Sequence, residues 1–408
     1  MKLLQINTTL NSGSTGRISE DIGKAVLASG NQSYIAAAYT NRPSDSTIIK
    51  VGNDFDRKLH GIKSLLLDRH GFGSAQSTKE LVGRISEVNP DIIHLHNIHG
   101  YYLHIGILFE FLKEAQIPVV WTFHDCWPFT GHCSYFDAVN CSKWQTQCNQ
   151  CPNIKGYPSS HGLDQSSRNF DDKQRIFNGL KSLQIVTPSQ WLAMHVRQSF
   201  LSNYPVRVIH NGVDLKVFAA TQLSWTVRAK YNLTSNRIIL GVASTWDKRK
   251  GLDDFIQLSG LIAKEIQIVL VGLNKEQLTN LPVNIKGIAR TENMQDLAAL
   301  YTAADVFINP TYVDNFPTTN IEALACGTPV ITYDTGGSPE AIDEATGFVI
   351  KKGNVQSLAD AVNTVLENGK NHYRSNCRKR AEHLFNKNDR YGDYLKLYES
   401  LLTQAVKN

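Results

Sequence analysis

The sequence predicts an α/β protein made of two domains, each built on a parallel sheet. Short apolar runs typical of buried strands alternate with longer segments of helical periodicity along the whole chain. This alternation restarts near residue 205, and 408 residues of which 42% are hydrophobic provide enough material for two cores. We therefore expect one domain over residues 1–205, a second over 206–388, and a final helix over 389–408.

The expected strands are the short apolar runs between helical segments. In the first domain these runs cover residues 3–7, 34–39, 91–95, 118–122 and 183–187. In the second domain they cover residues 238–243, 266–271, 305–309 and 329–332. Gly30 is placed to close the first helix, and Pro90 separates the helix around residues 81–88 from the strand that follows.

Composition narrows the class of protein. No run of about 18 apolar residues is present, which argues against a transmembrane helix. Residues 1–7 read as a first strand and not as a signal peptide, so we expect a cytoplasmic protein. The net charge of +5 is mild. It favours attraction to phosphates or to an anionic membrane surface over nucleic-acid binding.

Four of the seven cysteines lie close together in one predicted loop. They are Cys133, Cys141, Cys148 and Cys151, and the last two form a Cys-x-x-Cys pair. Four thiolates within reach of one another would form a closed structural zinc site. The alternative is a set of isolated cysteines that stay reduced in the cytoplasm.

The most informative segment covers residues 314–329, where Asp314 and Glu322 bracket a turn that leads into a helix. Pro317 suits the first helical position, Gly327 can end the helix in the left-handed conformation, and Pro329 prevents it from resuming. Free N–H groups at the start of such a helix form a seat for a phosphate. The residues that would surround it are Asn315, Phe316, Pro317 and Thr318. Glu322 could accept hydrogen bonds from ribose hydroxyls, although an ordinary loop-to-helix junction would look similar.

Polar residues also follow other predicted strands, where ligands bind in open α/β sheets. Lys248, Arg249 and Lys250 form a cationic cluster after the first strand of the second domain, suited to a leaving diphosphate. In the first domain Gly13, Gly16 and Arg17 follow the first strand, where glycines let backbone N–H groups approach an anion. A plain strand-to-helix turn explains this loop equally well.

Histidines end two further strands of the first domain. His124 and Asp125 follow one of them, and we expect His124 to be a site residue and Asp125 to orient its ring or face an acceptor. A buried, hydrogen-bonded histidine is the alternative. In the other strand, His94 and His96 share one face, and the turn after it displays Asn97 and His99. We prefer acceptor-sugar recognition by Asn97 and His99 over a metal site, since no neighbouring carboxylate or cysteine completes a tetrahedral set of metal ligands.

Residues 54–70 predict an amphipathic helix that carries several cations. The pattern favours a helix whose apolar side faces the core and whose charged side faces solvent. Contact with a lipid-linked acceptor at a membrane surface is the alternative interpretation.

The 314–322 segment resembles the Glu-x7-Glu motif of family 4 retaining glycosyltransferases, which have the GT-B fold of two Rossmann-like domains facing across a cleft. The resemblance implies that Asp314, where the family usually has Glu, lies near the donor sugar, and that Glu322 binds ribose. It also implies that Lys250, with Arg249 or Lys248 in place of an upstream Arg, neutralises the diphosphate, and that His124 lies near the reaction centre. Gly13, Gly16 and Arg17 would approach the donor diphosphate, Gly272 and Ile288 the base. The final helix would cross back over the first domain.

This resemblance, which includes the His-Asp-Cys-Trp-Pro segment at residues 124–128, is strongest to bacterial exopolysaccharide and O-antigen transferases. It implies transfer of a sugar, with retention, from a UDP- or GDP-linked donor to a glycan acceptor that is lipid-linked. Transfer would need no metal, and contact with the cytoplasmic face of the inner membrane would be peripheral. A nucleotide-sugar epimerase and a non-catalytic nucleotide-sugar-binding protein are the alternatives.

Overall fold

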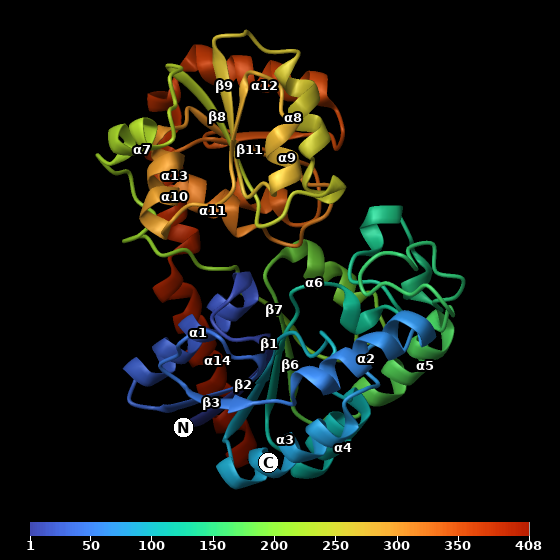
Figure 1. Cartoon of the computed structure of the whole chain (residues 1–408). Helices are drawn as coiled ribbons and strands as arrows, with labels where there is room; N and C mark the ends of the chain where they lie inside the picture. Colours follow the sequence, from blue (N-terminus) through green and yellow to red (C-terminus); the bar gives the residue numbers. More distant parts are fainter. Residues whose placement is uncertain (408) are drawn as a thin grey trace. The chain divides into compact units, whose positions relative to one another are not determined.

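The computed structural model describes residues 1–407 and divides into two compact units (Figure 1). Unit 1 consists of Met1–Ile209 together with the chain from Arg390 onward, and unit 2 is His210–Asp389. Each unit is built on one entirely parallel sheet, as the alternation of apolar runs and helices predicts. Among the residues described, no helix is both long enough and apolar enough to span a bilayer.

The sheet of unit 1 has seven strands in the order β3-β2-β1-β4-β5-β6-β7. Their bounds are β1 (Lys2–Thr9), β2 (Gln32–Tyr39), β3 (Thr47–Lys50), β4 (Ile92–Leu95), β5 (Val119–Thr122), β6 (Leu183–Thr187) and β7 (Val206–Val208). The order reverses between β1 and β4, and such a switch point leaves a crevice at the carboxyl ends of the two strands. The edge strand β7 pairs with β6, so the chain changes unit after residue 209 and not after 205.

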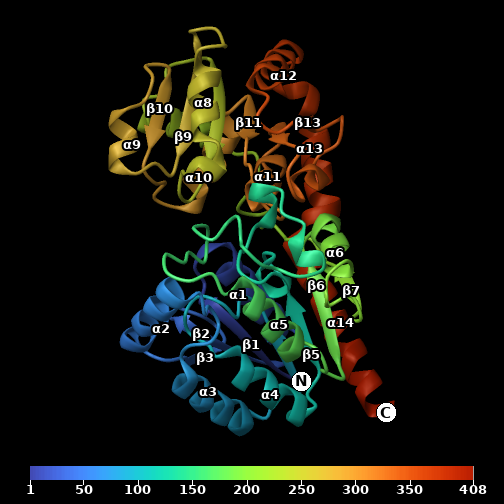
Figure 2. The same ribbon diagram turned by 90° about the vertical axis from the view of Figure 1, so that its right-hand side faces the viewer.

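Helices cover both faces of this sheet (Figure 2). They are α1 (Gly13–Ala28), α2 (Asp54–Leu67), α3 (Ala75–Val88), α4 (Ile105–Ala115), α5 (Ser166–Phe177), α6 (Gln190–Arg197) and part of α14 (Lys387–Lys407). Along β1, Leu4 and Ile6 enter one apolar cluster and Leu3 enters another, because successive side chains point to opposite faces. Tyr398 of α14 is buried in the second cluster, so the final helix packs on unit 1.

The sheet of unit 2 has the order β10-β9-β8-β11-β12-β13, which reverses between β8 and β11. Its strands are β8 (Arg237–Val242), β9 (Ile266–Val271), β10 (Ile285–Ile288), β11 (Val306–Asn309), β12 (Val330–Tyr333) and β13 (Gly347–Ile350). Its helices are α7 (Ser224–Lys230), α8 (Leu252–Ser259), α9 (Lys275–Thr279), α10 (Met294–Ala303), α11 (Thr318–Ala325), α12 (Val355–Asn368) and α13 (Lys370–Phe385). One large apolar cluster joins this sheet to its helices.

One expectation about helix orientation is wrong. The sequence favours a helix over residues 54–70 whose apolar side faces the core. In α2 the apolar side chains point outward, and Phe55 is 75% exposed. The side that faces the sheet is polar, with Arg57 and His60 buried.

Candidate functional site

The two unit 2 motifs meet at the switch point of its sheet. Lys250 follows β8 and Asp314 follows β11, and these two strands are neighbours. Lys250 Nζ lies 2.6 Å from Asp314 Oδ2, and both side chains are about one-fifth exposed. The structure therefore places a partly accessible ion pair where ligands bind in α/β sheets of this type.

The backbone of both loops holds this pair in position. Lys248–Lys250 forms one turn of 3-10 helix, and Asp247 Oδ1 accepts from the Lys250 N–H at 3.1 Å. The carbonyl of Arg249 accepts from the Tyr312 N–H at 2.8 Å, which joins the loop after β8 to the loop after β11. Lys250 is thus fixed from both sides, whereas Lys248 is exposed.

Helix α11 begins where the phosphate seat is expected. Pro317 takes the N-cap position, one residue before its expected place, and Thr318 is the first helical residue. Gly327 ends the helix at φ 72°, as predicted. Phe316 is buried, and its ring stacks on that of His210 with centroids 4.9 Å apart. Asn315 is buried beside it.

Glu322 lies in the second turn of α11 and is 8% exposed. Tyr301 of α10 donates its hydroxyl to Glu322 Oε2 at 3.1 Å. This hydroxyl helps to fix the orientation of the carboxyl group. Tyr301 is a residue that the motif itself does not reveal, because it comes from another helix.

The two segments expected to receive the base also lie together. The Gly272 N–H donates to the Ile288 carbonyl at 2.8 Å, so that carbonyl already has a partner. Gly272 has φ 103°, and a Cβ there would lie 1.7 Å from the Ala243 carbonyl oxygen. Only glycine fits this close approach.

At the switch point of unit 1, hydrogen bonds join the end of β1 to the turn after β4. Thr8 Oγ1 donates to the Asn97 carbonyl at 3.0 Å, and the Asn97 N–H donates to Asn7 Oδ1 at 3.3 Å. Gly13 begins α1 at φ 66° and Arg17 is exposed. Gly16 is buried, and a Cβ there would lie 2.9 Å from Thr9 Oγ1, which gives this glycine a packing role.

His124 forms the partly buried end of a hydrogen-bonded relay that the sequence does not reveal. Gln5 Nε2 donates to the Ser19 carbonyl at 2.8 Å, so Gln5 Oε1 is the acceptor in its 3.0 Å contact with His96 Nε2. Burial lowers the pKa of His96 well below its ordinary value, so the ring is neutral and its Nδ1 is an acceptor. The 3.0 Å contact between His96 Nδ1 and His124 Nε2 therefore places the His124 proton on Nε2.

His94 does not form a metal site with His96, although their rings lie 4.0 Å apart. His94 Nδ1 contacts the Tyr398 hydroxyl at 2.7 Å, and its Nε2 contacts Thr122 Oγ1 at 2.8 Å. Both ring nitrogens thus have protein partners.

Acid should destabilise unit 1, because its buried histidines resist protonation. Burial lowers the pKa of His60 and of His124 to about 4. Between the ordinary value near 6.5 and pH 4 the unfolded chain binds protons that the folded chain does not, so stability falls as pH falls. We expect a loss of up to about 3 kcal/mol per histidine by pH 4.

The measurement is thermal unfolding of the full chain from pH 7.5 to pH 4 at constant ionic strength. His372→Gln alters an exposed residue of unit 2 and should leave the slope unchanged. A midpoint independent of pH across this window would contradict the prediction.

Asp125 pairs with His99. Asp125 Oδ2 lies 2.8 Å from His99 Nε2, and Asp125 Oδ1 accepts from the Trp127 N–H at 2.9 Å. Burial opposes ionisation of this carboxyl, but His99 and these contacts outweigh it and keep the pKa of Asp125 below its ordinary value. Tyr157 lies 3.3 Å from His99 Nδ1. Asn97, His99 and Asp125 thus lie in one region of unit 1.

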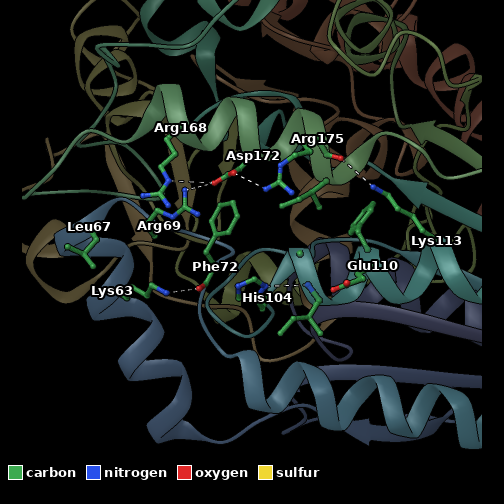
Figure 3. A pocket seen from close by; sticks show the side chains of 14 residues that line it. Lys63, Leu67, Arg69, Phe72, His104, Glu110, Lys113, Arg168, Asp172 and Arg175 are labelled. Carbon is green, nitrogen blue, oxygen red and sulfur yellow. Dashed lines mark hydrogen bonds and ion pairs between the residues drawn. The ribbon is translucent and has the colours of Figure 1, made fainter.

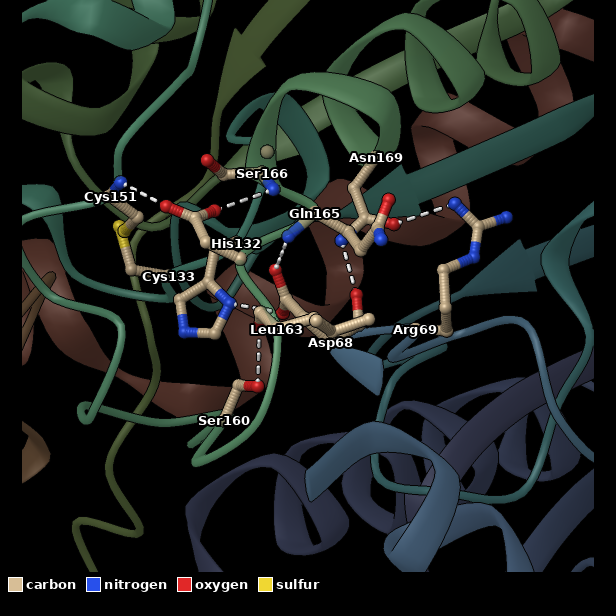
Figure 4. A network of polar contacts seen from close by, with 12 residues as sticks. Asp68, Arg69, His132, Cys133, Cys151, Ser160, Leu163, Gln165, Ser166 and Asn169 are labelled. Carbon is tan, nitrogen blue, oxygen red and sulfur yellow. Dashed lines mark hydrogen bonds and ion pairs between the residues drawn. The ribbon is translucent and has the colours of Figure 1, made fainter. Parts of the chain in front are cut away.

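The four cysteines line one small cavity together with His132. A hydrogen bond from the Cys133 thiol lowers the pKa of Cys151, and Figure 4 shows these two side chains next to each other. All seven cysteines are free thiols. Within residues 1–407, however, no three His, Cys, Asp or Glu side chains are arranged to hold a metal ion. The structure gives the expected zinc site no support.

Both halves of the chain match models of glycosyltransferase families. Residues 16–217 match the model of Glycosyltransferase Family 4. Residues 224–384 match the model of Glycosyl transferases group 1. The two matches together span most of both units.

Curated relatives extend over most of the chain. The colanic acid biosynthesis glycosyl transferase WcaC of Escherichia coli is 24% identical, over 88% of this chain and 89% of its own. A GDP-mannose-dependent mannosyltransferase of Corynebacterium glutamicum that acts on a monoacylated phosphatidylinositol monomannoside is 25% identical, over 78% of this chain and 88% of its own.

Solved structures share the fold at lower identity. Sucrose-phosphate synthase from Thermosynechococcus elongatus superposes with a TM-score of 0.73 at 19% identity, over 99% of both chains. HepE of Anabaena, solved with UDP-glucose, superposes with a TM-score of 0.70 at 17% identity, over 98% of this chain and 100% of its own.

Proposed function

The chain is a family 4 glycosyltransferase with the GT-B fold, and from this we propose that it transfers a sugar from a UDP- or GDP-linked donor to a hydroxyl of a lipid-linked glycan. The observation that supports the donor site is the Lys250–Asp314 ion pair at the switch point of unit 2, in which Asp314 belongs to the loop that leads to α11. The fixed positive charge and the start of a helix are both suited to a diphosphate.

Each donor contact that we propose has a physical reason. The N–H groups at the start of α11, from Thr318 onward, receive the diphosphate, and Lys250 neutralises its leaving oxygen with Arg249 in support. Glu322 accepts from the ribose hydroxyls, since an ionised carboxylate is an acceptor only. Gly272 and the backbone near Ile288 contact the base. By resemblance to the family, we assign Gly13 and Arg17 of unit 1 to phosphate recognition and His124 to sugar recognition.

We propose retention of configuration through a front-face step. The bond from the anomeric carbon to the acceptor oxygen forms on the side where the bond to the phosphate oxygen breaks. The departing phosphate accepts the acceptor's proton, and Lys250 stabilises its charge. NMR of the product should show the anomeric configuration of the donor, and mass spectrometry should show no glycosyl-enzyme adduct. Detection of a covalent glycosyl-enzyme adduct would contradict this mechanism.

The acceptor proposal is supported by the relatives. WcaC is named for colanic acid biosynthesis, and the mannosyltransferase of Corynebacterium glutamicum is named for an acylated, lipid acceptor. We place the reaction at the cytoplasmic face of the bacterial membrane, in synthesis of a surface polysaccharide. Asn97, His99 and Asp125 are the residues we assign to acceptor recognition.

The deciding experiment is a transfer assay with UDP- and GDP-linked hexoses and undecaprenyl-diphosphate-linked oligosaccharides as acceptors. We expect labelled sugar to enter the lipid fraction with donors of one base. Tight donor binding with no transfer to any of these acceptors would instead indicate a nucleotide-sugar-binding protein. Interconversion of the sugar without an acceptor would indicate an epimerase.

Transfer should not depend on a divalent metal. Lys250, Arg249 and the start of α11 supply the positive charge that a metal would otherwise bring to the diphosphate. Addition of EDTA to the assay should therefore change the rate by less than about twofold. A loss of activity that Mg²⁺ or Mn²⁺ restores would contradict this expectation.

A further inference from the structure

Helix α2 carries an apolar surface that nothing in unit 1 covers. We define the apolar face of α2 as Phe55, Leu59, Ile62 and Leu66, which are 75%, 56%, 54% and 52% exposed. Their spacing places them on one side of the helix. In Figure 2 the helix lies at the edge of its unit. A contiguous apolar patch of this kind on a folded protein marks an interaction surface.

Polar contacts on the opposite side fix the helix in this rotation. Arg57 donates to the Ala38 carbonyl at 3.1 Å. His60 Nε2 accepts hydrogen bonds from the backbone N–H groups of Gly71 and Gly73, each at 3.2 Å. His60 Nδ1 lies 3.1 Å from Ser74 Oγ. Rotating the helix so that its apolar face points inward would break these contacts. Buried polar groups would then become exposed or lose their hydrogen-bond partners.

The end of α2 is held as well. Asp68, its buried C-cap, contacts His132 Nδ1 at 2.5 Å and accepts from the Gln165 N–H at 2.8 Å (Figure 4). The Leu163 N–H donates to the Leu66 carbonyl at 3.1 Å, and Leu163 is 49% exposed. The exposed apolar surface therefore continues from α2 onto the segment that follows the cysteines.

A cationic cavity adjoins the apolar face. Lys63 and Leu67 of α2 form part of its wall, and its volume is about 790 Å³ (Figure 3). Its charged lining comprises Lys63, Arg69, Lys113, Arg168 and Arg175, against only Glu110 and Asp172. Three of these arginines share the single carboxylate of Asp172, at 2.9, 3.9 and 3.1 Å. The cavity thus carries an excess of positive charge.

We propose that the apolar face of α2 inserts into the surface of an anionic bilayer, while the adjoining cavity receives phosphate-bearing lipid headgroups. Apolar side chains on one side of a helix, with cations beside them, are the combination that holds a helix in a membrane interface. Charge complementarity favours an anionic bilayer as the partner. A second copy of this chain would place two cationic cavities next to each other, and their like charges would repel. All of these residues belong to unit 1. The inference rests on the proposed function in one respect only, which is that the bilayer would be the place where the enzyme meets a lipid-linked acceptor.

The test is co-sedimentation of the full chain with vesicles of phosphatidylcholine alone or mixed with phosphatidylglycerol. We expect binding to the mixed vesicles that falls at least about tenfold in Leu59→Glu/Ile62→Glu. Arg168→Gln/Arg175→Gln should lose about fivefold per charge on the mixed vesicles. Trp225→Glu/Val283→Glu, with the same change in charge at exposed apolar residues of unit 2, should bind like the wild type.

Equal binding by all variants, or none by the wild type, would overturn the proposal. So would a concentration-dependent dimer in sedimentation velocity that the Leu59→Glu/Ile62→Glu change abolishes, because a second copy would then be the occupant. Nucleotide-induced thermal stabilisation should persist in every variant. A failure of membrane binding can thus be told apart from a failure of the donor site.

Discussion

Replacing Lys250 with methionine should lower kcat of sugar transfer by about 100- to 1,000-fold, the usual cost of removing one preorganised electrostatic group from a transition state. Methionine keeps most of the volume of the lysine stem but removes the charge. It also leaves the carboxylate of Asp314, which lies 2.6 Å from the ammonium group, without that cation. Charge on the departing phosphate would then develop beside an uncompensated anion.

Lys248→Met is the matched control, because Lys248 lies in the same short turn and is exposed. We expect it to retain kcat within about threefold of the wild type, as surface charges contribute little. The thermal midpoints of both variants should stay close to that of the wild type. If Lys248→Met lost more activity than Lys250→Met, the assignment of the leaving-group cation would be wrong.

Replacing Glu322 with glutamine should weaken binding of the preferred nucleoside diphosphate by about 10- to 100-fold. A hydrogen bond to a charged group contributes about 1.5–3 kcal/mol, and the neutral amide offers one oxygen acceptor in place of two charged oxygens. The measurement is a titration with UDP, GDP, ADP and CMP in the presence of EDTA, followed by thermal shift and calorimetry. Stabilisation by one of these nucleotides in the wild type would also identify the base.

Tyr301→Phe provides the control, since it removes only the hydroxyl that donates to Glu322 Oε2. Both carboxyl oxygens of Glu322 are retained in this variant, and we expect a loss of affinity of less than about fivefold. Unchanged affinity in Glu322→Gln would show that ribose is held elsewhere. No stabilisation of the wild type by any of the four nucleotides would remove the basis for the donor site as a whole.

The parallel sheets could be predicted from the sequence because a buried strand is a local signal. Apolar runs such as residues 266–271 and 118–122 correspond to β9 and β5. The edge strands β3 and β7 have four and three residues, and they carry too few apolar positions to stand out. Because β7 was not among the expected strands, the expected domain boundary after residue 205 lies four residues before the observed boundary after residue 209.

The positions of the candidate motifs could be predicted as well, since ligands bind after the strands and those positions can be counted along the chain. Their partners were not readable. Lys250 and Asp314 are 64 residues apart in sequence, and only the order of β8 and β11 in the sheet makes them neighbours. The Gln5–His96–His124 relay likewise depends on β1, β4 and β5 lying side by side.

The fold class, the family resemblance and the periodicity of each helix could be predicted from the sequence, because all three depend on residues that are close in the chain. The rotation of a helix about its axis and the pairing of side chains depend on contacts between distant segments. Helix α2 is an example. Its periodicity places Phe55, Leu59 and Ile62 on one side, but the direction of that side is set by partners of Arg57 and His60 that other segments supply. Such distant contacts leave no local trace in the sequence.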